Sequence, residues 1–266
     1  MRIQKYSIFV GVVALAVCNP TALRQLCLPQ TTSSEIAATK LDDYGNLSTD
    51  DEAARLDLFA DKLFKQPKLR GQIIAYCEPK MERGWYLRRI HGIGKYLTYA
   101  RGIEANRVAV VDGGYRQRLT TELWLIPEDA NPPLPGPTLP QPPASISSAY
   151  KFDAECLDCA PAVGLYLYAL DDGLKFYAEE LRKHTGARAI FIVRPDQDVS
   201  IRIALNEAHK ARRLLIKSYG IEADRITVRS ARSLNDGTAV VEMWVVPAGA
   251  KFRAVTSHKA LQLTAR

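Results

Sequence analysis

Long hydrophobic runs are scarce in this sequence of 266 residues. The apolar run from Ile8 to Val17 is shorter than the roughly twenty apolar residues that a permanent transmembrane helix needs. Charged residues make up 24% of the chain and hydrophobic residues 47%, close to the average of soluble globular proteins. This composition excludes a polytopic membrane protein, a collagen and a disordered chain, and the length is sufficient for one or two globular domains.

The sequence also lacks the residue patterns of common catalytic and metal sites. No serine–histidine–acid order, pair of catalytic carboxylates or cluster with metal-ligand spacing stands out. We therefore expect a noncatalytic binding protein with no cofactor and no metal. Its 36 basic and 29 acidic residues give a net charge of +7, spread over both halves, which favours anionic partners only mildly and which solubility alone could explain.

The N-terminus has the features of an export signal. Arg2 and Lys5 precede the apolar run, and Ala14–Ala16 supplies the small-x-small pattern that a signal peptidase needs. We predict a signal peptide over residues 1–17 and a mature protein in the periplasm or cell envelope. The alternative is a lipoprotein signal, because the residues before Cys18 resemble a lipobox; only then would the protein be bound to a membrane.

Cysteine is rare, with five residues in the chain. Two lie at or near the export signal, Cys77 lies in the first half, and Cys156 and Cys159 form a C-x-x-C in the second half. A structural zinc site normally needs four ligands, and no second pair accompanies this one. In an oxidising compartment the pair is a candidate disulfide. The alternative is a redox-active thiol pair, whose reactivity depends on a lowered thiol pKa.

Proline, in contrast, is concentrated in one place. Residues 132–143 read Pro-Pro-Leu-Pro-Gly-Pro-Thr-Leu-Pro-Gln-Pro-Pro, a composition that favours an extended polyproline conformation. We predict a proline-rich linker over residues 128–148.

The sequence repeats itself on either side of this linker. Three segments recur: Gly102–Val108 as Gly220–Ile226, Gln72–Tyr76 as Ala189–Val193, and Glu122–Pro127 as Glu242–Pro247. Such self-similarity indicates two copies of one domain. We assign the first repeat to residues 40–127 and the second to 149–248, followed by a C-terminal tail, 249–266.

Hydrophobic periodicity predicts the elements of one repeat. The first helix has apolar residues at helical spacing and is ended by Pro67. The expected order is a short strand near Leu41–Tyr44, a helix over Glu52–Leu63, a strand over Gln72–Cys77, a helix over Tyr86–Ala100, and strands over Arg107–Val111 and Thr120–Ile126. Gly113 and Gly114 predict a turn between the last two strands.

This order, with its G-I-x-A-x-R-I/V segment leading into a strand, resembles the OmpA-like periplasmic domain family. The resemblance covers both repeats. It implies an α/β fold, an α+β sandwich: two tandem βαβαββ domains, each with helices packed on one face of a mixed sheet. Members of the family bind peptidoglycan, holding the diaminopimelate of the stem peptide with an aspartate after the second strand and an arginine on the following helix.

The resemblance places a candidate ligand site in the first repeat. Glu78 stands at the aspartate position, and Arg88 and Arg89 lie next to Ile90, where the register puts the arginine. A carboxylate can hold the ammonium group of the ligand, and an arginine fork can bind its carboxylate through two hydrogen bonds. In the second repeat the arginine position is Ala208, which predicts that this copy has lost the site.

Three functions remain as alternatives. The first is an exported binding protein that contacts peptidoglycan or another anionic envelope polymer through Glu78, Arg88 and Arg89. The second is a degenerate OmpA-like scaffold that binds envelope proteins and has no glycan site. The third is a thiol redox protein that uses Cys156 and Cys159. We expect no nucleic-acid partner in any of these cases.

Overall fold

A computed structural model describes residues 37–140, 147–157, 170–196, 199–233 and 238–252. The predicted export signal, Cys18 and Cys159 lie outside the described residues. The two repeats belong to one compact unit, which begins at Ile36. Within the described ranges, every helix is too short or too polar to span a lipid bilayer.

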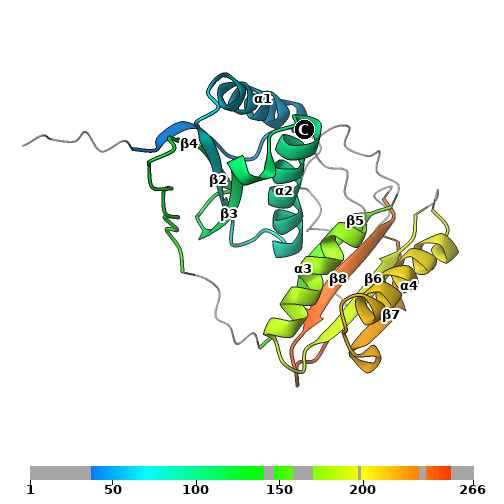
Figure 1. Cartoon of the computed structure of the whole chain (residues 1–266). Coiled ribbons are helices and arrows are strands. Elements are labelled where there is room, and N and C mark those ends of the chain that lie inside the picture. Colours follow the sequence, from blue (N-terminus) through cyan, green and yellow to red (C-terminus); the bar gives the residue numbers. More distant parts are fainter. Residues whose placement is uncertain (1–36, 141–146, 158–169, 197–198, 234–237, 253–266) are drawn as a thin grey trace, which may run out of the picture. The chain divides into compact units, whose positions relative to one another are not determined.

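Each repeat contains one mixed four-stranded sheet with helices packed against it (Figure 1). The first repeat consists of β1 (Thr39–Tyr44), α1 (Thr49–Lys65), β2 (Arg70–Cys77), α2 (Arg83–Lys95), β3 (Val108–Tyr115) and β4 (Thr120–Ile126). The second consists of β5 (Tyr150–Cys156), α3 (Leu170–Lys183), β6 (Arg188–Arg194), α4 (Ile201–Lys217), β7 (Ile226–Ser230) and β8 (Val240–Val246). The predicted order of strands and helices is therefore confirmed.

The two sheets have the same topology. The first has the order β1-β4-β2-β3 and the second β5-β8-β6-β7. The pairs β2–β3 and β6–β7, each at one edge of its sheet, are parallel, and the other neighbours are antiparallel. A parallel pair needs a crossover connection, which α2 and α4 supply. The sequence repeat thus corresponds to a repeat of structure.

Local signals explain the boundaries of α1. The Ser48 side chain caps the helix by accepting a hydrogen bond of 3.2 Å from the backbone N–H of Asp51. Leu56, Phe59 and Leu63 are fully buried on one face, as their spacing predicts. The sequence predicts a cap near Asp51, but the cap is Ser48, so the helix begins three residues before Glu52. It ends at Lys65, two residues before Pro67. After Lys95, α2 continues as one π-helical turn, Tyr96–Ala100, so the second helix also ends where the sequence predicts.

The strand β2 is buried on both faces of the first sheet. Ile73 faces the helices and packs in the cluster that includes Phe59 and Leu123. Gln72 and Tyr76, which alternate with it, point to the opposite face, as expected from the period of two in a strand. That second face is covered by the residues that follow β4, as described below.

The glycine pair forms a bulge and not the predicted turn. Gly113 and Gly114 lie inside β3, where the pairing with β2 shifts register between Ala75 and Cys77. Gly114 has a φ of +88°, a backbone conformation that residues other than glycine rarely adopt. A Cβ on Gly113 would lie 2.5 Å from the Tyr76 ring. The absence of a side chain at Gly113 therefore leaves room for the Tyr76 ring.

The structure also corrects the alignment of the repeats by one residue. Gln72 lies opposite Trp124, and Ile190 lies opposite Trp244. The structural equivalent of Gln72 is therefore Ile190 and not Ala189. An uninterrupted apolar strand has no polar residue to fix its register, which is why the sequence left this offset undetected.

Cys77 is a free and buried cysteine at the end of β2. Burial raises the pKa of its thiol to about 11, although Arg83 nearby opposes the rise. We predict that iodoacetamide at pH 8 labels Cys77 at least about tenfold more slowly in the native protein than in urea, because the thiolate is the reactive form. Peptide-level mass spectrometry measures the rate at this residue. Equal rates in the two conditions would contradict the buried position.

Candidate functional site

The candidate ligand residues lie on the loop after β2 and on the first turns of α2. Glu78 directly follows the strand, and its carbonyl accepts a hydrogen bond from the Met81 N–H at 3.0 Å, which closes a turn. The Glu78 side chain is half-exposed. Arg88 and Arg89 are neighbours on α2, so their side chains leave the helix in directions about 100° apart. The structure consequently separates the two arginines and gives them different partners.

Arg88 forms a buried ion pair with the second repeat. Its Nε and Nη2 donate to the two carboxylate oxygens of Asp153 on β5, each at 2.8 Å, and its Nη1 donates to Glu155 at 2.8 Å. The side chains of Arg88 and Asp153 are 5% and 0% exposed. Burial raises the pKa of Asp153, and the attraction of Arg88 opposes that rise. This bidentate geometry is the one an arginine would offer to a ligand carboxylate, but here it binds the chain itself.

Arg89 is used inside the first repeat. Its Nη2 forms an ion pair with Glu52 of α1, and its Nη1 donates to the Thr121 hydroxyl of β4 at 3.1 Å. The Arg89 and Glu52 side chains are 4% and 2% exposed. This arginine therefore ties both helices of the repeat to the sheet.

Further contacts join α2 to the second repeat. Glu82, just before the helix, forms an ion pair of 2.6 Å with Lys151 on β5. A Cβ on Gly84 would lie 2.6 Å from Asp153 and 2.7 Å from Phe152, so only glycine fits at this position of the helix. The strand–loop–helix region that the resemblance assigns to a glycan ligand is thus a contact between the repeats.

The second repeat has a different set of residues in the corresponding region. Arg194 at the end of β6 is buried and donates from Nε to Glu242 of β8 at 3.0 Å. Ala208, on α4, is fully buried in the core of the second repeat. Asp196 follows β6 and is half-exposed. Arg194 is thus paired with a residue on β8, the neighbouring strand of the same sheet.

Sequence reasoning missed one cluster beside this region. Arg83 forms an ion pair with Asp112 of β3, and its guanidinium lies over the rings of Tyr86 and Tyr115 at 4.8 and 5.2 Å. The Tyr86 hydroxyl donates to the Ala75 carbonyl at 2.6 Å. The sequence signal was Asp112 before the two glycines, which we interpreted as part of a turn.

Cys156, one of the two candidate thiols, lies at the end of β5 and is disulfide-bonded. Cys77, the other cysteine among the described residues, is free. Cys159, the other member of the C-x-x-C, lies outside the described residues.

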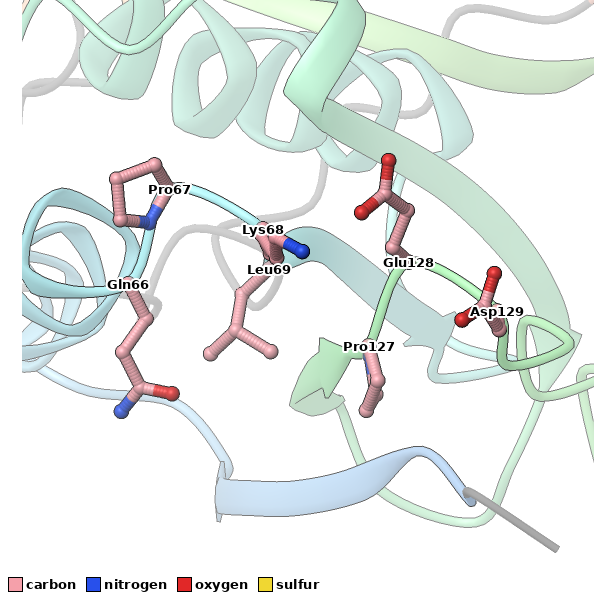
Figure 2. Close-up of a pocket in the computed structure, with 7 residues that line it drawn as sticks. All are labelled: Gln66, Pro67, Lys68, Leu69, Pro127, Glu128 and Asp129. Atoms are coloured by element: carbon pink, nitrogen blue, oxygen red, sulfur yellow. The ribbon is translucent and has the colours of Figure 1, made fainter.

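A surface pocket lies away from these residues, between the α1–β2 connection and the residues after β4 (Figure 2). It is lined by Gln66, Pro67, Lys68, Leu69, Pro127, Glu128 and Asp129. Lys68 contributes positive charge, whereas Glu128 and Asp129 contribute negative charge. The pocket does not include Glu78 or either candidate arginine.

We predict that Asp153→Ala lowers the free energy of unfolding by about 3–5 kcal/mol, because it leaves Arg88 buried without its main partner. Urea denaturation of the full chain measures this loss. The double variant Arg88→Met/Asp153→Leu should recover most of the stability, since it removes both buried charges.

The matched control is Arg101→Met, which breaks the exposed ion pair with Asp57 and should change the midpoint little. Equal effects of the control and of Asp153→Ala would contradict a buried, stabilising contact between the repeats.

No protein-family model matches the chain, and no curated protein is detectably similar to it. This chain's own contacts hold Arg88 and Arg89 in buried ion pairs and leave Glu78 half-exposed at the surface.

Proposed function

We propose that this chain is an exported, noncatalytic cell-envelope protein whose two OmpA-like repeats act together as a scaffold for protein–protein contacts. The observation that carries the proposal is the burial of both candidate arginines, each against a carboxylate of this same chain. An arginine in this state can bind an external carboxylate only by breaking its buried pair, which costs several kcal/mol. The geometry therefore favours a scaffold over a glycan receptor.

The architecture supports the OmpA-like part of the proposal. Both repeats have the order βαβαββ and a mixed sheet with helices packed against it, as the family resemblance implies. The G-I-x-A-x-R segment has the same role in both copies: Arg107 donates to the Leu63 and Leu69 carbonyls, and Arg225 donates to the Leu181 and Ala187 carbonyls. This arginine of the motif is thus structural, because it links the start of β3 or β7 to the C-terminal end of the first helix of its repeat, α1 or α3.

The contact between the repeats supports the scaffold part. Arg88, Glu82 and Gly84 of the first repeat all meet β5 of the second. Separating the repeats would leave the buried charges without partners, so these contacts oppose separation. Two repeats held in contact can bind one partner together, with less entropy lost than two separate domains would lose.

The sharpest test uses Glu78, because this candidate residue is half-exposed and its substitution leaves the buried pairs intact. Mature protein, Glu78→Gln and the matched control Glu104→Gln, an exposed glutamate of the same repeat, are each incubated with insoluble peptidoglycan at physiological salt. We expect all three to sediment only at background level. Retention of the mature protein and the control, with loss in Glu78→Gln, would show that the glycan-binding alternative is right.

A second measurement tests the scaffold directly. Lysine cross-linking in intact envelopes, read by mass spectrometry, should join Lys95 of the first repeat and Lys210 of the second to the same partner protein. Cross-links confined to this chain would count against the proposal.

A further inference from the structure

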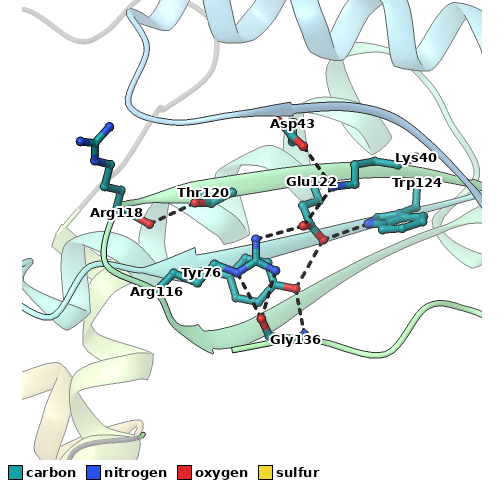
Figure 3. A network of polar contacts seen from close by, with 9 residues as sticks. All are labelled: Lys40, Asp43, Tyr76, Arg116, Arg118, Thr120, Glu122, Trp124 and Gly136. Atoms are coloured by element: carbon teal, nitrogen blue, oxygen red, sulfur yellow. Dashed lines mark hydrogen bonds and ion pairs between the residues drawn. The ribbon is translucent and has the colours of Figure 1, made fainter. Parts of the chain in front are cut away.

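The proline-rich segment after β4 is not a free spacer over its whole length. Residues 130–139, which we name the strap, lie against the face of the first sheet that is opposite α1 and α2. The strap is held by side chains from β2 and by Tyr115 and Arg116 at the end of β3. Figure 3 shows Gly136 of the strap next to Tyr76 and Arg116, with hydrogen bonds to both.

Side-chain donors of the sheet bind the backbone carbonyls of the strap. Arg70 donates to the Ala130 carbonyl at 3.1 Å, and Gln72 donates to the Pro133 carbonyl at 2.8 Å. Arg116 donates to the Gly136 carbonyl from two nitrogens, at 3.2 and 3.1 Å. A polyproline segment has no internal hydrogen bonds, so its carbonyls are available to such donors.

Three backbone N–H groups of the strap also donate to the first sheet. The Gly136 N–H donates to the Tyr76 hydroxyl at 3.0 Å. The N–H groups of Thr138 and Leu139 both donate to the Tyr115 carbonyl at 3.1 Å, and Leu139 forms an antiparallel bridge with Tyr115. The strap is therefore recognised mainly through its backbone over ten residues.

A charged network holds the receptor side chains in place (Figure 3). The guanidinium of Arg116 lies over the Tyr76 ring, 3.4 Å from its centroid, and Nη1 of Arg116 donates to Glu122 at 3.0 Å. The Trp124 indole N–H also donates to Glu122, at 3.1 Å. Burial raises the pKa of Glu122, but the hydrogen bonds from Trp124 and Arg116 outweigh it and hold the pKa below its usual value. The site is thus preorganised, with an aromatic ring and three donors facing the strap.

The second repeat keeps the network but changes the receptor residues. Glu242 accepts a hydrogen bond of 2.8 Å from the Trp244 indole, as Glu122 does from Trp124. Ile190 replaces Gln72 in the register, and Arg194 stands at the place of Tyr76. Among the described residues, the set of donors that binds proline-rich backbone belongs to the first repeat.

We propose that this face of the first sheet is a receptor site for proline-rich, extended peptides, and that the chain's own strap occupies it in cis. The inference rests on the proposed scaffold function and names its class of partner: an envelope protein with an exposed proline-rich segment. Because the donors bind carbonyls and not strap side chains, peptides of other sequence but the same conformation fit.

A tethered strap competes at an effective concentration on the order of millimolar. A partner therefore reaches the site when the strap is displaced, and the test must remove the strap first. In the full chain, residues 131–139 are replaced by a glycine–serine sequence of equal length. A fluorescein-labelled peptide with the sequence of residues 131–143 is then titrated, and its anisotropy is measured.

We expect saturable binding to the replaced chain and at least about tenfold weaker binding to the wild-type chain, whose site is filled. In the replaced chain, Gln72→Ala and Arg116→Gln should each weaken binding about tenfold, because each removes a donor to a peptide carbonyl. The matched control is Arg118→Gln, two residues after Arg116, which should bind the peptide unchanged.

Two results would overturn the proposal: no binding by a replaced chain with native circular dichroism, or equally tight binding of a peptide in which every proline is replaced by serine. If the replaced chain does not fold, the full chain with Gly136→Pro, which removes the N–H bound by Tyr76, is titrated with the same peptide and the same two outcomes apply. Glu78-dependent sedimentation with peptidoglycan would refute the scaffold function, whereas these titrations test the peptide site alone.

Discussion

The buried ion pair between Arg88 and Asp153 is the interaction on which the relation of the two repeats depends. Two charges removed from water are stable only when each has a complete set of partners, and here the carboxylate accepts two bonds from one guanidinium. The missing side chains of Gly84 and Gly173 provide the space, since a Cβ on either would press against Asp153 or Arg88. The repeats consequently meet through a contact that tolerates little change in position.

This contact also determines which functions the first repeat can have. The helix α2 carries Arg88 toward the second repeat and Arg89 toward Glu52 and Thr121, so both arginines serve the architecture. A site for a charged ligand requires a charged side chain that is able to bind the ligand. The two arginines already bind carboxylates of this chain, and breaking either pair would leave buried charges without partners, at a large cost in free energy. The opposite face of the sheet, with Tyr76 and Arg116, instead binds backbone through polar groups that are held ready by Glu122.

The proline-rich segment after β4 packs against the first sheet. Its composition favours an extended chain with free carbonyls, and the sheet face supplies donors at the spacing of that chain. The strap covers the second face of β2, which explains why a strand at the centre of a four-stranded sheet is buried on both sides. A segment that composition alone identifies as a linker is thus, over residues 130–139, part of the first domain's packing.

The sequence by itself determined the repeat, the order of strands and helices, and their approximate positions, because hydrophobic periodicity and proline act over a few neighbouring positions. It also identified Glu78, Arg88 and Arg89 as residues of unusual interest. Only the tertiary structure decided what the arginines do, because Asp153 and Glu52 are 65 and 37 positions away from them in the chain. The glycine bulge in β3 and the docking of the strap were also decided there. Each depends on a side chain, above all Tyr76, that approaches from another element, and no local pattern encodes such a contact.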